Sequence, residues 1–299
     1  MSRIVQLLIF GLQLGGIYAL LALGYNMVYG IVGMINFAHG DFLMVGAYAA
    51  FFLAAAIGGT SYSAGTVILI ILLSMVISGL LGVITERIAY KPLRNRPRLM
   101  SLITAVAVSM FIENLFRAIP FIGPTPRAFP SFFPLQSYTF LGAEITSIQI
   151  AIIGLAALLM VILYLFIMRS PVGRQMRAIS MDREASALVG INVDKVISIT
   201  FLIGASLAAA SGIFYSSIYP IIDVYMGSWL GNKAFIAAVL GGIGDVRGAM
   251  LGGLIMGITE VMGTAINSDL GYGICFLILI LIMLLKPAGL LGKNTVEKV

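Results

Sequence analysis

Ionisable residues are rare in this 299-residue chain, and a few of them lie inside long apolar stretches. The single histidine, His39, stands between Asn36 and Asp41, and Glu260 lies within a late apolar stretch. Charged groups are costly in apolar surroundings, so each is a candidate for ligand contact or proton binding. One histidine with no cysteine or carboxylate cluster at ligand spacing predicts no metal site and excludes a catalytic triad.

These residues leave alternative roles open. On a helix, Asn36, His39 and Gly40 share one face, where they either line a translocation path or hold a bend by hydrogen bonding. We favour the structural role for His39. Glu260 has three candidate roles: pairing with a basic residue of a partner subunit, contact with a substrate ammonium group, or an inert protonated state.

Two glycine-rich stretches interrupt the apolar pattern, GIVGMINFAHGD at 30–41 and GGIGDVRG at 241–248. Unwound backbone at membrane depth is tolerated only against protein or a water-filled cavity. Paired interruptions point to transport sites in carriers built from inverted repeats, although these two stretches share composition more than residue order. The candidates for a translocation path or a broken helix are therefore Asn36, His39, Gly40, Asp41, Gly242, Gly244 and Glu260.

The surroundings of these residues are those of a membrane protein. Hydrophobic residues make up 60% of the chain and charged residues only 10%, so lipid is its main solvent. The apolar runs reach the roughly 20 residues that a helix needs to cross a bilayer, and they lack the alternation of barrel strands. We predict one all-α transmembrane domain over 1–299, a polytopic bundle of about 8–9 spans with broken helices. The candidate spans are 4–28, 36–57, 64–86, 99–118, 146–168, 196–218, 231–245, 248–266 and 273–286.

The net charge of +6 indicates topology rather than nucleic-acid binding, because most basic residues flank apolar segments. They place loops 87–98 and 169–195 in the cytoplasm and the proline-rich loop 119–145 in the periplasm. Nine spans put the N-terminus outside, against the preference of Arg3 for the cytoplasm. The first apolar segment is predicted to be a retained span, and the single Cys275 to serve packing.

Loop 169–195, RSPVGRQMRAISMDREASALVGINVDK, is expected to contain a short helix. Asp182 can cap its start, Glu184 suits its first turn, and Gly190 suits the left-handed position after its end. About two turns of helix are too short to be stable alone in water. The helix therefore docks either on its own membrane domain or on a partner.

The string EASALVG at 184–190 resembles the Glu-Ala-Ala-x-x-x-Gly signature of bacterial ABC-importer permeases, with serine in place of the second alanine. This resemblance implies a coupling helix seated in a cleft of a cytoplasmic ATPase. The coupling residues it implies are Arg183, Glu184, Ala185, Ser186 and Gly190.

Longer stretches resemble the H-type permease of the high-affinity branched-chain amino acid (Liv) importers along nearly the whole chain. They are ALLALGYNMVYGIVGMINFAHGDFLMVGAY at 19–48, ERIAYKPLRNRPRL at 86–99, AFIAAVLGGIGDVRGAMLGGLIMGI at 234–258 and LKPAGLLG at 285–292. The resemblance implies a bacterial inner-membrane complex with a second, M-type permease, two ATPase subunits and a periplasmic substrate-binding protein. It implies that ATP and Mg²⁺ are bound by the partners, with no cofactor or nucleic acid on this chain, which has no P-loop string.

The leading hypothesis is a permease subunit without enzymatic activity, importing leucine, isoleucine and valine. Permeases of the same type for urea, short amides or other amino acids stay open, because the binding protein supplies much of the selectivity. An ion-coupled carrier could use Asp41, His39, Glu113 and Glu260 as its coupling site, and a passive channel or scaffold is a third class. The docking signature in loop 169–195 favours the permease, since a carrier or a channel has no use for it.

Overall fold

The computed structural model describes residues 2–59, 62–94, 96–133, 136–140, 142–268 and 270–292. Within these ranges the chain is almost entirely helical, which confirms the all-α polytopic fold. Among the described residues, seven helices are long and apolar enough to cross a membrane. They are α1 (Ser2–Val32), α2 (His39–Ile57), α3 (Ala64–Thr85), α4 (Arg98–Ala118), α5 (Ser147–Arg169), α8 (Val193–Ile218) and α10 (Val246–Ile266).

The predicted number of eight to nine spans is approximate, because two of the predicted spans correspond to short helices. These are α9 (Met226–Gly241) and α11 (Leu270–Leu285), each with 16 residues. A straight helix needs about 20 residues to cross the hydrocarbon core. Hydropathy alone does not register where a helix ends, so it extended one predicted span to residue 245.

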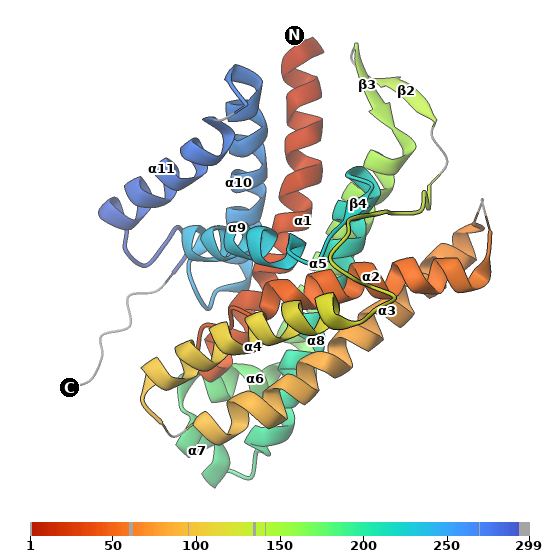
Figure 1. The fold of residues 1–299 in the computed structure, drawn as a ribbon. Coiled ribbons are helices and arrows are strands. Elements are labelled where there is room, and N and C mark those ends of the chain that lie inside the picture. Colours follow the sequence, from red (N-terminus) through yellow and green to blue (C-terminus); the bar gives the residue numbers. More distant parts are fainter. Residues whose placement is uncertain are drawn as a thin grey trace.

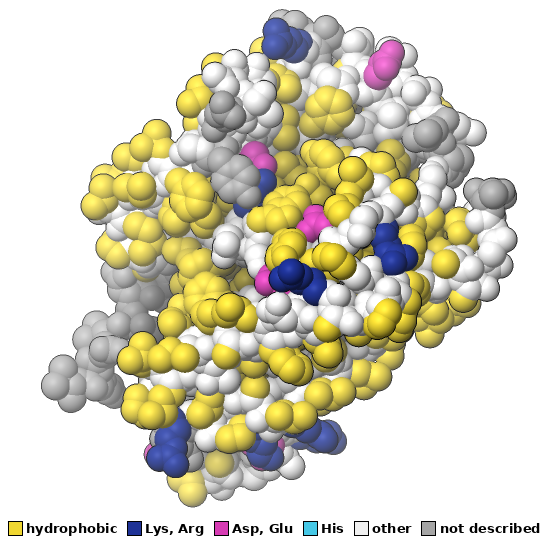
Figure 2. Space-filling model, viewed as in Figure 1, with side chains coloured by type: hydrophobic (Ala, Val, Ile, Leu, Met, Phe, Trp, Pro, Cys, Tyr) yellow, Lys and Arg dark blue, Asp and Glu magenta, His cyan; other side chains and the backbone are white. Residues whose placement is uncertain are grey.

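Helices α1, α2 and α8 form the centre of the bundle, and α4 and α5 lie at its edge with few of their residues buried. Figure 1 shows α1 running upright beside α10, while α2, α3 and α4 cross the view at a steep angle to it. Hydrophobic side chains cover large areas of the surface in Figure 2. Basic side chains lie along its lower edge, and further basic and acidic side chains lie in its middle and upper parts. The broad apolar areas are those of a chain surrounded by lipid.

Helices α1 and α10 pack closely because glycines face each other along their crossing. A Cβ atom on Gly257 would lie 2.1 Å from the Gly15 backbone nitrogen, and one on Gly11 would lie 2.8 Å from the Ile258 Cα. Small residues let backbones approach where lipid provides no hydrophobic drive for association. The glycines of α1 and α10 therefore allow close helix packing within this chain.

The loop predicted to be periplasmic and the loops predicted to be cytoplasmic lie at opposite ends of the bundle (Figure 1). At one end, strand β1 (Arg127–Ala128) pairs antiparallel with β4 (Ile221–Ile222), and β2 (Ser137–Phe140) pairs antiparallel with β3 (Ala143–Thr146). The Gln6 side chain exchanges two 2.8 Å hydrogen bonds with the Glu144 backbone, so α1 begins at this end. At the other end lie α6 (Pro171–Met181), α7 (Arg183–Leu188), the π-helix η1 (Glu86–Tyr90) and the 3₁₀-helix η2 (Lys91–Leu93).

Candidate translocation and coupling sites

Helix α7 forms as its local sequence predicts. The Asp182 carboxylate accepts a 2.9 Å hydrogen bond from the Ala185 backbone N–H, which caps the helix start. Gly190 adopts a φ of 85°, the left-handed conformation that glycine favours after a helix end. The predicted cap and the predicted end of this helix are both confirmed.

The side chains of α7 divide into an anchored group and an exposed group. Ser186 is buried, and its hydroxyl donates a 2.6 Å hydrogen bond to the Asp182 carbonyl, so serine is accommodated where the signature has alanine. Glu184 and Ala185 are exposed, as is Gly190, while Arg183 is half-buried. Leu188 is 88% exposed. An exposed carboxylate beside an exposed leucine makes this projection suitable for contact with another protein.

The two glycine-rich interruptions lie against each other. The first lies between α1 and α2, where Gly33 has a φ of 72°, and the second between α9 and α10, where Gly242 has a φ of 110° and Gly244 a φ of 89°. Both are breaks between helices, as predicted. A Cβ atom on Gly30 would lie 3.2 Å from the Gly244 Cα, so the two breaks are in contact.

A single polar side chain from α1 satisfies the unwound backbone. The Asn26 amide nitrogen donates to the carbonyls of Gly242 at 3.1 Å and Asp245 at 3.0 Å. Its amide oxygen accepts a 3.4 Å hydrogen bond from the Gly244 N–H. Backbone N–H and C=O groups that water does not reach need such partners. Asn26 therefore replaces hydrogen bonds that the backbone loses where the helix is interrupted. Sequence reasoning missed this residue, although a lone asparagine within an apolar helix was a signal.

The C-terminal stretch LKPAGLLG also supports the second break. Leu290 and Leu291 donate backbone hydrogen bonds of 3.0 and 2.9 Å to the carbonyls of Leu240 and Gly241. A Cβ atom on Gly242 would lie 2.4 Å from the Gly292 nitrogen, so this position needs glycine for its φ and for its space. The cavities that adjoin Asn26 at the breaks are small, about 10 and about 60 Å³. In this conformation protein fills most of the space around the breaks.

Asn36 lies outside the helix that was expected to carry it. Helix α2 begins at His39, so the predicted helical face shared by Asn36, His39 and Gly40 is wrong for Asn36. The residue instead closes a turn, with its carbonyl accepting from the His39 N–H at 3.1 Å. Its side-chain oxygen accepts a 2.6 Å hydrogen bond from the Tyr90 hydroxyl, which ties the first break to η1.

His39, Gly40 and Asp41 are all enclosed by protein at the start of α2. The His39 ring lies 4.5 Å from the Tyr25 ring, centroid to centroid. A Cβ atom on Gly40 would lie only 2.1 Å from the Gly227 carbonyl oxygen, so α2 and α9 cross at this point with no room for a side chain. These contacts are those of a packed helix junction. Neither ring nitrogen of His39 has a hydrogen-bond partner among the described residues, so the structure shows His39 packed at the junction without the hydrogen bonds expected of it.

Glu260 pairs with a lysine of the same chain. The Lys233 ammonium lies 2.5 Å from one Glu260 carboxylate oxygen, and the Tyr18 hydroxyl donates a 2.9 Å hydrogen bond to the other. The lysine side chain is 6% exposed and the glutamate side chain 14%. Sequence reasoning missed Lys233, although it is the one basic residue of the predicted span 231–245. Intramembrane ions are paired in this way because an isolated one is costly.

A cavity of about 590 Å³ opens beside this pair, toward the end of the bundle that carries the β-strands. Apolar side chains such as Phe10, Leu14 and Ile218 form much of its wall, and Glu260 and Gln13 contribute polar groups. The Gln13 side chain is 4% exposed, and its amide nitrogen has no hydrogen-bond partner among the described residues. Cavities of roughly 300–1,000 Å³ with apolar walls and few polar groups suit small ligands.

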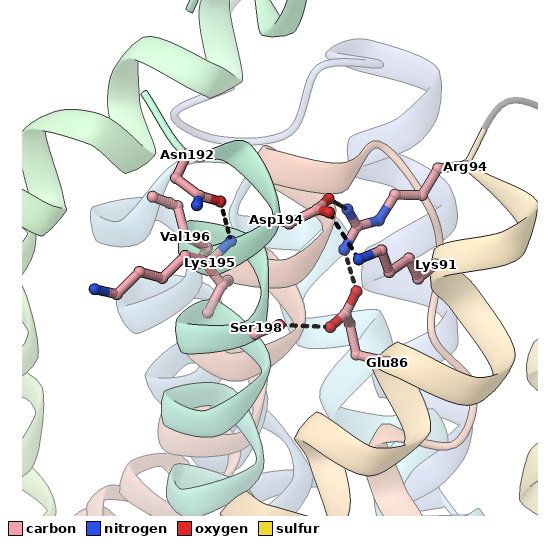
Figure 3. Close-up of polar contacts among 9 residues, drawn as sticks. Glu86, Lys91, Arg94, Asn192, Asp194, Lys195, Val196 and Ser198 are labelled. Carbon is pink, nitrogen blue, oxygen red and sulfur yellow. Dashed lines mark hydrogen bonds and ion pairs between the residues drawn. The ribbon is translucent and has the colours of Figure 1, made fainter. Parts of the chain in front are cut away.

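A second charged cluster lies at the opposite end, near α7 (Figure 3). Arg94 pairs with both Glu86 and Asp194, and Lys91 lies 2.7 Å from the other Asp194 oxygen. The Ser198 hydroxyl donates a 2.7 Å hydrogen bond to Glu86. Lys91 and Arg94, two basic residues of loop 87–98 that the sequence indicated only as topology signals, thus bind this loop to the start of α8.

Membrane-length helices, a charged pair beside a cavity at one end and a capped helical projection at the other define a polytopic membrane transport protein. The chain belongs to the family described as "Branched-chain amino acid transport system / permease component", whose family model matches residues 7–283. This match confirms the resemblance drawn from the sequence. Within the described part of the chain, no group of three or more His, Cys, Asp or Glu side chains is placed to hold a metal ion.

Curated relatives cover almost the whole chain. The high-affinity branched-chain amino acid transport system permease protein LivH of Escherichia coli (strain K12) is 42% identical over 303 residues, 99% of this chain and 97% of the relative. The permease protein BraD of Pseudomonas aeruginosa is 40% identical, covering 99% of this chain and 98% of the relative. A probable LivH of Methanocaldococcus jannaschii is 27% identical and covers 92% and 88%. No solved structure matches the chain.

Proposed function

We propose that this chain is a membrane-spanning subunit of an ATP-driven importer that carries leucine, isoleucine and valine across the bacterial inner membrane. The observation that carries this proposal is the 42% identity, over 99% of the chain, to a permease named for high-affinity branched-chain amino acid transport. Its partners are a second, M-type permease, two cytoplasmic ATPase subunits that bind ATP and Mg²⁺, and a periplasmic substrate-binding protein.

In this assembly α7 is the helix that docks on the ATPase. The exposed Glu184 and Leu188 supply a charge and an apolar contact, while Ser186 and the Asp182 cap keep the short helix formed. Movement of the docked helix reaches the bundle through α8, which follows α7 after a four-residue connection. The ion pairs of Arg94 with Asp194 and Glu86 transmit the movement further, to the end of α3.

The cavity beside Glu260 is the candidate substrate site. A zwitterionic amino acid carries one cation and one anion, so its ammonium can replace Lys233 at Glu260 while its carboxylate binds Lys233. This exchange leaves no unpaired buried charge, which would be costly. The apolar wall near Phe10, Leu14 and Ile218 receives a branched aliphatic side chain.

The two contacting breaks then serve as the hinge of the transport cycle. Rotation at Gly242 and Gly244 moves α10, which carries Glu260, against α9, which carries Lys233. Hinges of this kind absorb large backbone changes in a few residues. Asn36, His39, Gly40 and Asp41 keep the facing break packed while this happens.

The proposal is tested by purifying the tagged chain from its native membrane in mild detergent and identifying what accompanies it. We expect two ATPase subunits and a second permease in fixed proportion, with ATP hydrolysis stimulated by leucine and its binding protein. Stimulation by urea or a short amide alone would contradict the proposed substrate but would leave the importer proposal standing. A chain that purifies alone and transports in liposomes without ATP would contradict the importer and favour an ion-coupled carrier.

A further inference from the structure

A groove of about 690 Å³ lies between α3 and α8, at the end of the bundle that carries α7. Its walls toward the middle of the bundle are apolar, formed by Leu80 and Val83 of α3 with Ile199 and Leu202 of α8. Its mouth is basic. The basic residues at the mouth are Arg87, Lys91 and Lys195.

The charges at this mouth are only partly compensated. Lys91 is paired with Asp194 at 2.7 Å, and Figure 3 shows Lys195 extending away from those ion pairs. Arg87 and Lys195 are exposed, and neither has an acidic partner among the residues that the structure describes. Two unpaired cations therefore flank the groove where the helices reach the predicted cytoplasmic boundary.

The apolar part of the groove continues along the outer surface of α3. Leu80 is 53% exposed, and it belongs to a stripe of exposed aliphatic side chains on this helix. The stripe comprises Ile68, Leu69, Leu72, Leu73, Val76, Ile77, Leu80 and Ile84. A surface of this kind, on a helix long and apolar enough to span a membrane, faces hydrocarbon chains.

We propose that this groove binds an anionic glycerophospholipid, with its phosphate between Arg87 and Lys195 and an acyl chain along Leu80 and Leu202. Basic pockets between transmembrane helices on the cytoplasmic side suit such headgroups. An acidic protein surface or a soluble phosphate would satisfy the two cations but would leave the apolar wall uncovered. Asp194 and Ser198 line the same groove, so the lipid also braces the junction between loop 87–98 and α8. This site goes beyond the proposed import function and is independent of the substrate.

The test is native mass spectrometry of the full-length chain in its purified complex, titrated with phosphatidylglycerol or phosphatidylcholine of identical acyl chains. The test variant is Arg87→Gln with Lys195→Gln. The control is Arg169→Gln with Arg174→Gln, which removes two exposed cations outside the groove. Because a basic residue near an anionic lipid contributes about 1 kcal/mol, losing two should weaken phosphatidylglycerol binding roughly 30-fold.

The proposal predicts one phosphatidylglycerol retained more tightly than phosphatidylcholine by the wild type and the control, with the preference lost in the test variant. Glycerol phosphate at millimolar concentration should not displace this lipid. Equal retention of both lipids by the wild type, or unchanged retention by the test variant, would overturn the site. Displacement by glycerol phosphate would show that the groove binds phosphate rather than lipid.

Discussion

Two buried charged clusters in the described part of the chain, one toward each end, differ in what they face. Glu260, which is paired with Lys233, lines a cavity of about 590 Å³. Glu86, Arg94 and Asp194 form a chain of contacts that joins two segments, with both groups of the Glu86–Arg94 pair almost completely buried. The first pair can exchange partners with a ligand, whereas the second cluster has its charges satisfied by the protein itself. We propose that similar chemistry serves transport at the first pair and holds two segments together at the second cluster.

The largest effect is expected at the cluster of Glu86, Arg94 and Asp194, which we call the inner cluster. Arg94→Met leaves Glu86 as a buried carboxylate without its cation, and breaking such a pair destabilises a protein by about 3–5 kcal/mol. Thermal unfolding of the detergent-solubilised chain should show a much lower Tm. The double variant with Glu86→Gln should recover much of the loss, because no buried charge remains. Wild-type stability in Arg94→Met would remove the distinction between the two clusters.

Substitution in the pair of Lys233 and Glu260, which we call the outer pair, should change the rate of transport more than the stability of the protein. Glu260→Gln keeps the hydrogen bond from Tyr18 but removes the charge that receives the substrate ammonium, so uptake of leucine should fall by roughly 10- to 100-fold, as expected for loss of a charged hydrogen bond. Uptake into proteoliposomes containing the whole importer measures this, with assembly checked on the same preparation. A Glu260→Gln importer that transports normally would show that the pair is structural, like the inner cluster.

The smallest effect is expected at the exposed margin of the inner cluster. The Lys91 side chain is 49% exposed, and its partner Asp194 keeps Arg94, so Lys91→Gln should change stability by less than about 1 kcal/mol. The same unfolding assay provides the comparison with Arg94→Met. A loss as large as that of Arg94→Met would mean that the whole network, and not the buried pair, holds the two segments together.

Sequence reasoning succeeded where the signal was local. The Asp182 cap, the left-handed Gly190 and the two breaks each follow from a few neighbouring residues, and each is present. The number of spans was approximate because hydropathy does not show that α9 and α11 have only 16 residues. The role of α7 itself stays a prediction.

The pairings that organise the sites were not predictable in this way. Asn26 binds backbone more than 200 residues away, and Arg94 reaches Asp194 across 100 residues. Such contacts depend on how helices cross, and the pattern of a single sequence does not carry that information. Lys233 and Glu260 are closer in sequence, but only the α9–α10 turn at Gly242 and Gly244 brings them together.

The central claim is that α7 couples this membrane bundle to an ATPase, and Glu184→Lys tests it most directly. The variant reverses the charge of an exposed side chain. Leucine uptake driven by ATP should be abolished while the protein stays in the membrane at normal amounts, with Arg174→Gln as a control in the same loop. Wild-type uptake by Glu184→Lys would contradict the coupling assignment.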